Sequence, residues 1–145
     1  AGRVLALQVG MRQHRGGGMS LVTGIGGIFF KSRNPPDLAR WYREVLGMPN
    51  DPNTSSWAFP WQDINGEPGY TIWGVMRAST SYFGNSGQMF MVNLRVTDLD
   101  AALAKVRAAG AQVDDKVEVT AEGRFGWFTD PDGRRVELWE PTPLK

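Results

Sequence analysis

Few side chains in this sequence could carry out chemistry. The 145 residues include no cysteine and a single histidine, His14. Thiolate nucleophiles, disulfides, Cys-bound zinc and iron–sulfur clusters are therefore excluded. Glu137 is the candidate catalytic residue, because an acid among apolar neighbours can serve as a general base or a metal ligand. It could equally be an orienting acceptor or a structural partner of Arg95 or Lys31. Apolar rings would raise its pKa and a nearby arginine would lower it.

Alternation along the predicted strands separates two faces. One face should meet solvent in a single open sheet, yet it is rich in aromatic and apolar residues, so both faces need cover. The candidate ligand-binding residues on it are Phe29, Lys31, Met91, Asn93, Arg95, Phe125, Trp127 and Trp139, to which we add Trp57, Trp61 and Trp73. We expect an aromatic-lined pocket for a planar or extended apolar ligand, oriented by Arg95, Lys31, Asn93 and Glu137. The other interpretation is that these rings form core or a dimer interface.

Two capped helices position these strands. Asn34 as N-cap, Pro35 at the first position and Gly47 as stop predict a helix over 35–46. Asp98 and Gly110 bound a second helix over 99–109. The first helix has an apolar stripe that we expect to pack in the core: Leu38, Trp41, Tyr42, Val45 and Leu46.

The strand–cap–helix–glycine pattern occurs twice and indicates an internal duplication. Strands are expected over 24–33, 56–61 and 70–76 in the first half, and over 90–96, 117–120, 124–129 and 135–140 in the second. We interpret residues 1–20 as a leader or extension, 21–78 as one βαβββ module, the polar stretch 79–88 as a linker, and 89–145 as the second module.

The sequence resembles the vicinal oxygen chelate superfamily, the glyoxalase, bleomycin-resistance and dioxygenase group, from Gly24 to Pro141. The resemblance depends on the segments LARWYREVLG at 38–47, VTDLD at 96–100 and FTDPDGRRVELWE at 128–140. It implies an α+β fold in which paired βαβββ modules form a curled mixed sheet, with the ligand inside the cup and the helices outside. Homodimers are common in such families, so we expect a homodimer.

Catalytic members of that superfamily hold a divalent metal at four strand positions. Carried over to this chain, these positions fall on Gly27, Met91, the region 72–74 and Glu137. Glycine has no donor and a methionine sulfur is a poor ligand for hard or borderline ions, so only Glu137 remains. We therefore predict no metal and no cofactor.

Composition limits the partners. Sixteen basic and fifteen acidic residues give a net charge of +1, and no apolar run reaches the length of a membrane span. We expect no nucleic acid, no membrane and a cytoplasmic location. The leading hypothesis is a metal-free protein that binds an aromatic or apolar small molecule, as the antibiotic-sequestering relatives do. The alternative is a glyoxalase-like lyase, isomerase or dioxygenase-related enzyme using Glu137. A third is an interaction module whose aromatics join subunits.

Overall fold

The computed structural model describes residues 21–84 and 87–143, so the leader predicted over 1–20 lies outside the described residues. Its elements, in chain order, are β1 (Val22–Ser32), α1 (Pro35–Leu46), β2 (Trp57–Gln62), β3 (Pro68–Arg77), β4 (Phe90–Val96), α2 (Leu99–Ala108), β5 (Gln112–Val113), β6 (Glu118–Thr120), β7 (Gly123–Thr129) and β8 (Arg135–Pro141). Neither helix is long and apolar enough to cross a membrane.

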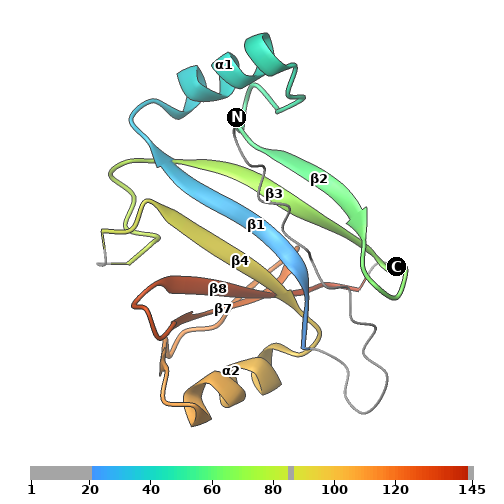
Figure 1. Ribbon diagram of the computed structural model, residues 1–145, viewed down its shortest axis with the longest axis vertical. Coiled ribbons are helices and arrows are strands. Elements are labelled where there is room, and N and C mark those ends of the chain that lie inside the picture. Colours follow the sequence, from blue (N-terminus) through green and yellow to red (C-terminus); the bar gives the residue numbers. More distant parts are fainter. Residues whose placement is uncertain (1–20, 85–86, 144–145) are drawn as a thin grey trace, which may run out of the picture.

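The eight strands form one mixed sheet in the order β2-β3-β1-β4-β8-β7-β5, with β6 paired to β7. The two halves join where β1 and β4 run antiparallel, and each of these strands has a parallel neighbour, β3 or β8. Figure 1 shows α1 at one end of the curled sheet and α2 at the other. The predicted α+β fold of paired modules is confirmed, although two strands rather than three follow α1 in the first module.

The predicted helix caps are confirmed. The Asn34 side chain accepts a hydrogen bond from the Asp37 N–H, and Gly47 adopts the left-handed conformation that ends α1. The Asp98 side chain accepts from the Ala101 N–H in the same way at the start of α2. The capping residues in the sequence therefore predict the ends of both helices to within one residue.

The apolar stripe of α1 differs from the prediction that it would pack in the core. Trp41, Val45 and Leu46 are 51%, 56% and 68% exposed. Tyr42 does pack, with its ring 5.1 Å from that of Trp73. The physical reason is position: α1 lies at the end of the sheet, where it contacts β1 and β3.

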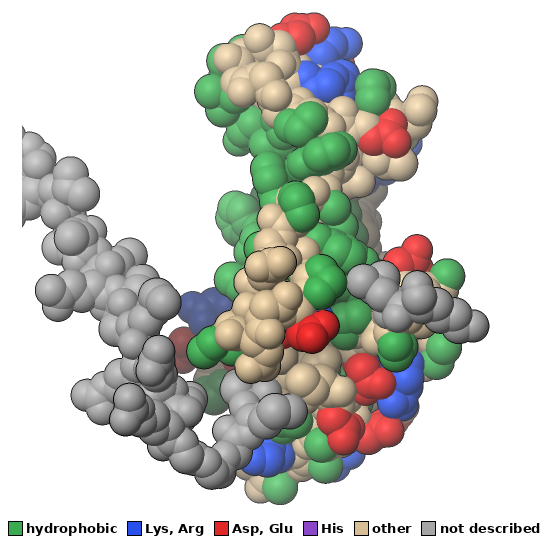
Figure 2. Space-filling view, turned by 90° about the vertical axis from the view of Figure 1, so that its right-hand side faces the viewer, with side chains coloured by type: hydrophobic (Ala, Val, Ile, Leu, Met, Phe, Trp, Pro, Cys, Tyr) green, Lys and Arg blue, Asp and Glu red, His purple; other side chains and the backbone are tan. Residues whose placement is uncertain are grey.

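Two apolar clusters lie on opposite faces of the sheet. The first sits between α2 and the sheet and is built around Leu99, Leu103 and Leu138. The second lies on the other face and is built around Phe83, Met91 and Trp127. Side chains of the hydrophobic type also gather at the narrow waist of the molecule (Figure 2).

The stretch 79–88, predicted as a polar linker, also supplies core side chains. Phe83 is fully buried in the second cluster, and Tyr82 packs against the same cluster. The Arg135 guanidinium donates to the Tyr82 carbonyl oxygen, which ties this stretch to β8. The polar composition of the stretch concealed this role, because two adjacent aromatic residues give no periodic pattern.

We predict that Phe83→Ala lowers the free energy of unfolding by about 3–5 kcal/mol, the usual cost of a cavity left by a buried phenylalanine. Phe59→Ala is the matched control, because Phe59 lies on the edge strand β2 and is 41% exposed. Urea unfolding of both variants measures the difference. Equal losses in the two would contradict the assignment of residue 83 to the core.

Candidate functional site

One row of residues crosses the sheet through its centre. Ile72 of β3 lies beside Gly27 of β1, which lies beside Asn93 of β4, then Glu137 of β8 and Trp127 of β7. Residues opposite one another in register share a face, so this row lies on one side of the sheet. It is the concave side, because the Tyr70 and Trp139 rings meet at 5.1 Å across the two intervening strands.

Glu137 lies at the floor of this cup and is 1% exposed. Its Oε1 accepts a hydrogen bond of 2.6 Å from Asn93 Nδ2. Its Oε2 accepts one of 2.9 Å from Trp127 Nε1 and another from the Tyr82 hydroxyl. Both oxygens of the carboxylate are thus engaged by neutral donors of the same chain.

Burial governs the electrostatics of this cluster. Loss of solvation raises the pKa of Glu137, and the hydrogen bonds from Tyr82, Asn93 and Trp127 oppose that rise. Burial and the neighbouring carboxylate together raise the pKa of Tyr82 above its usual value, so its hydroxyl stays protonated and able to donate. The sequence left open whether apolar rings or an arginine would decide the Glu137 pKa, and desolvation decides it.

Asn93 occupies the strand position that the family resemblance assigned to Met91. Met91 lies two residues earlier in β4, opposite Phe29, whereas Asn93 lies opposite Gly27 and next to Glu137. Asn93 Oδ1 is buried and has no hydrogen-bond partner within the described ranges. It faces Gly26, where an added Cβ would collide with Oδ1 and approach Trp139 to 2.8 Å.

The family's metal does not fit this row. A metal would need donors from Gly27, Asn93, Glu137 and the Ile72 region, and two of these positions have none. The Glu137 oxygens already accept three hydrogen bonds, which a cation would have to displace. In the part of the chain that the structure describes, no three His, Cys, Asp or Glu side chains come together as a metal site.

Most of the predicted ligand residues do line the cup. Phe29, Met91 and Trp127 pack together in the second cluster. The Trp139 ring stacks on Phe125, with centroids 6.3 Å apart and planes 12° apart, and Lys31 Nζ lies 5.5 Å from the centre of the Phe83 ring.

Arg95 and Trp61 form a separate contact. The Arg95 guanidinium lies 5.5 Å from the Trp61 ring and pairs with Asp63 at 3.5 Å. The Trp61 indole N–H donates to Thr71 Oγ1. These contacts hold Arg95 against the end of β2.

Trp57 and Trp73 depart from the prediction that they line the cup. Trp73 lies beside Ile28 in register and packs against Phe30 at 5.0 Å, on the face that carries α1. Trp57 is directly opposite Trp73 on β2. The physical reason is the two-residue period of a strand: the cup face of β3 carries Ile72 and Gly74, so Trp73 must point the other way.

Sequence reasoning missed four cup residues, namely Tyr70, Ile72, Met76 and Tyr82. Tyr82 lies in the supposed linker, and no alternation marks it. Tyr70 does alternate with Ile72 on β3, so its place beside the cup could have been found from the strand period.

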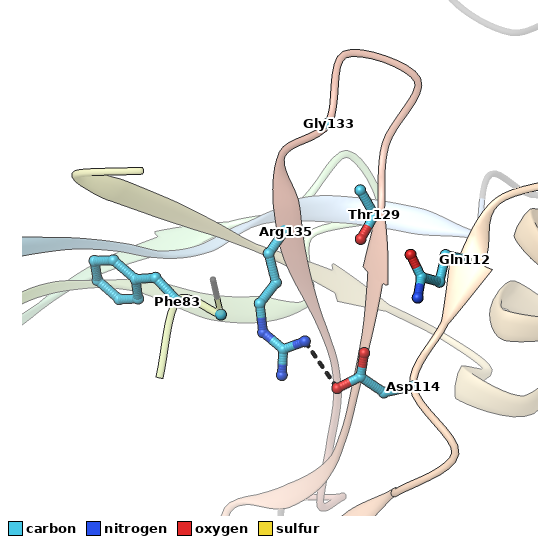
Figure 3. Close-up of a pocket in the computed structure, with 7 residues that line it drawn as sticks. Phe83, Gln112, Asp114, Thr129, Gly133 and Arg135 are labelled. Atoms are coloured by element: carbon cyan, nitrogen blue, oxygen red, sulfur yellow. Dashed lines mark hydrogen bonds and ion pairs between the residues drawn. The ribbon is translucent and has the colours of Figure 1, made fainter. Parts of the chain in front are cut away.

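A pocket of about 310 Å³ is lined by Phe83, Gly84, Gln112, Asp114, Thr129, Gly133 and Arg135. Figure 3 shows Arg135 reaching from β8 to Asp114, with a 2.8 Å ion pair between them. The polar side chains of Gln112 and Thr129 also line this pocket. A second hollow of about 510 Å³ lies at the start of α1, between Arg33 and Arg77. Neither hollow is lined by the predicted ligand residues.

Three features define the class of protein: the paired modules, the curled sheet and the row of residues that crosses the centre of the sheet. A glyoxalase-like domain model matches residues 27–139, and the chain belongs to this glyoxalase-like domain family of the vicinal oxygen chelate superfamily. No curated protein is significantly similar in sequence.

Several solved structures share the fold. A Mycobacterium tuberculosis methylmalonyl-CoA epimerase is 21% identical, with a TM-score of 0.54 over 87% of this chain and 93% of that one. A Streptomyces coelicolor methylmalonyl-CoA epimerase in complex with 2-nitronate-propionyl-CoA is 18% identical, with a TM-score of 0.59 over 86% and 98%. A Legionella pneumophila protein described as an NAD-dependent benzaldehyde dehydrogenase is 12% identical, with a TM-score of 0.50 over 80% and 98%. At these identities the likeness shows the fold alone.

We predict that Glu137→Gln is more stable than the wild type near pH 8 and loses this advantage toward pH 4. Because the folded-state pKa of Glu137 is raised, the folded protein keeps a proton that the unfolded chain has released. Stability therefore falls as the pH rises from the unfolded-state pKa to the raised one. A glutamine cannot ionise, and its amide nitrogen can donate to Asn93 Oδ1 once the Asn93 amide turns over.

Urea unfolding between about pH 4 and pH 8 measures this difference. Glu44→Gln, on the exposed side of α1, is the matched control and should show no such pH trend. A Glu137→Gln protein that becomes less stable than the wild type as the pH rises would contradict this prediction and show that the charge itself holds the cluster together.

Proposed function

We propose that this chain binds an aromatic or apolar small molecule in its cup without a metal. The observation that supports the proposal is the hydrogen bonding of the buried Glu137 carboxylate. The carboxylate at the family's metal position is saturated by Tyr82, Asn93 and Trp127, while the surrounding cup keeps its aromatic side chains.

The partly exposed cup residues supply the contact surface. They form the mouth of the cup, above the buried floor of Met91, Asn93 and Glu137. The mouth consists of Phe29, Lys31, Tyr70, Ile72, Met76, Tyr82 and Phe125. Aromatic rings in such a position offer stacking contacts worth about 0.5–1.5 kcal/mol each beyond the area they bury.

The geometry favours binding over catalysis by Glu137. A general base must come within hydrogen-bond reach of the proton it removes. Glu137 is 1% exposed and both of its oxygens accept hydrogen bonds, so a substrate would have to displace at least one of the three donors to reach a carboxylate oxygen. The epimerase neighbours show that this fold can serve enzymes, and the metal-free acid–base alternative for this chain would require that displacement.

The homodimer expected from the resemblance remains part of the proposal. The exposed apolar stripe of α1, with Trp41, Val45 and Leu46, supports it, because a second copy would cover this surface.

Divalent metal ions are expected to leave the stability of the protein unchanged. A ligand present at about 100 times its dissociation constant stabilises a fold by about 2.7 kcal/mol, which would raise the melting temperature by several degrees. Addition of about 1 mM nickel, zinc or magnesium chloride should shift it by less than about 1 °C. A larger increase that Glu137→Gln abolishes would contradict the metal-free proposal.

The neutral fluorophore N-phenyl-1-naphthylamine should bind the wild type, and Phe125→Ala should weaken binding by about tenfold. The loss of a stacking ring and its buried area accounts for that change. Fluorescence titration measures the affinity. Trp41→Ala is the matched control, because Trp41 is an exposed aromatic residue on α1, away from the cup. Loss of binding in Trp41→Ala but not in Phe125→Ala would place the fluorophore on the outer stripe instead.

A further inference from the structure

We propose that the ligand of the cup is an amphiphilic anion, whose acidic group is bound by Lys31 while its apolar body lies on the aromatic mouth. This inference rests on the proposed binding function and names the class of ligand. It makes Lys31 the residue that determines specificity.

The other cations of the cup face are already paired. Arg95 meets Asp63 at 3.5 Å and also donates to Thr23 Oγ1. Arg135 meets Asp114 at 2.8 Å and donates to the Tyr82 carbonyl oxygen. Both guanidinium groups therefore hold loops against the sheet.

Lys31 differs from these two arginines. It lies opposite Met76 on the cup face, is partly buried, and has its ammonium 5.5 Å from the Phe83 ring centre. Across residues 21–84 and 87–143, no carboxylate lies within 4 Å of that ammonium. A partly buried cation that faces an apolar cup without an acidic partner gains more from an anion than an exposed one does.

The acidic residues of the cup attract a cationic ligand less strongly than Lys31 attracts an anionic one. Glu137 is buried and its oxygens are engaged. Glu118 lies opposite Phe125 in register, on the same face, but it is exposed. Solvent and salt screen an exposed charge much more strongly than a partly buried one, so Lys31 has the larger influence on a ligand.

Two fluorophores with the same apolar body test this assignment. 8-Anilinonaphthalene-1-sulfonate carries a sulfonate that N-phenyl-1-naphthylamine lacks. Lys31→Met keeps an unbranched side chain over Phe83 and removes the charge. Lys31→Arg restores a cation, and Lys105→Met, on the exposed side of α2, is the matched control. Circular dichroism melts verify that each variant folds.

Lys31→Met should weaken binding of the sulfonate by about tenfold, as expected for a lost charge-assisted contact, and change the affinity for the neutral compound by less than about twofold. Lys31→Arg should recover most of the sulfonate affinity, and Lys105→Met should behave as the wild type. Raising NaCl from about 20 to about 500 mM should weaken the sulfonate on the wild type but not on Lys31→Met.

Other outcomes separate the two proposals. If both fluorophores bind the wild type and Lys31→Met affects neither, the ligand class is wrong and the binding function stands. If Lys31→Met weakens both equally, Lys31 acts only through packing and the inference is overturned. If neither fluorophore binds the wild type, the binding function itself fails, and the inference fails with it.

Discussion

A buried carboxylate without a cationic partner is the constraint on which the cup depends. Glu137 has no lysine or arginine nitrogen within 4 Å in the described ranges, and three neutral donors solvate it instead. Burial of an unpaired charge is costly unless hydrogen bonds replace water. Each of the three donors must therefore stay in place, and each comes from a different part of the chain: β4, β7 and the segment that joins the two modules.

The joining segment is the least expected of these parts. Tyr82 brings its hydroxyl to Glu137, and the adjacent Phe83 fills the space between Met91 and Trp127. Arg135 then holds the segment from the other side, through the Tyr82 carbonyl and Asp114. The same hydrogen bonds that satisfy the carboxylate thus hold the joining segment against the concave face of the sheet.

Sequence periodicity predicted much of the candidate site. Alternation placed Phe29, Lys31, Asn93, Glu137 and Trp127 on one face, and register confirms that they share it. Periodicity failed for Trp57 and Trp73, because it separates the two faces of a strand without saying which of them is the cup. The assignment of the second-module position to Met91 instead of Asn93 came from the family resemblance, since both residues lie on the same face of the strand. The register shifts between β1 and β4, at Val22/Gly24 and Ile25/Gly27, also went unpredicted, because a bulge of this kind leaves no signal in hydrophobic spacing.

The sequence by itself determined the two helices, the strand faces and the family resemblance, because caps, alternation and residue chemistry are local properties. Only the tertiary structure decided which side chains solvate Glu137, which cations are paired and which aromatic residues face the cup. Those outcomes depend on pairing between β1, β4 and β8 and on the path of residues 79–84, which bring together residues as distant in the sequence as Val22 and Val96 or Tyr82 and Glu137. Contacts of that range are set by the competition among all packing arrangements, and no single segment encodes them.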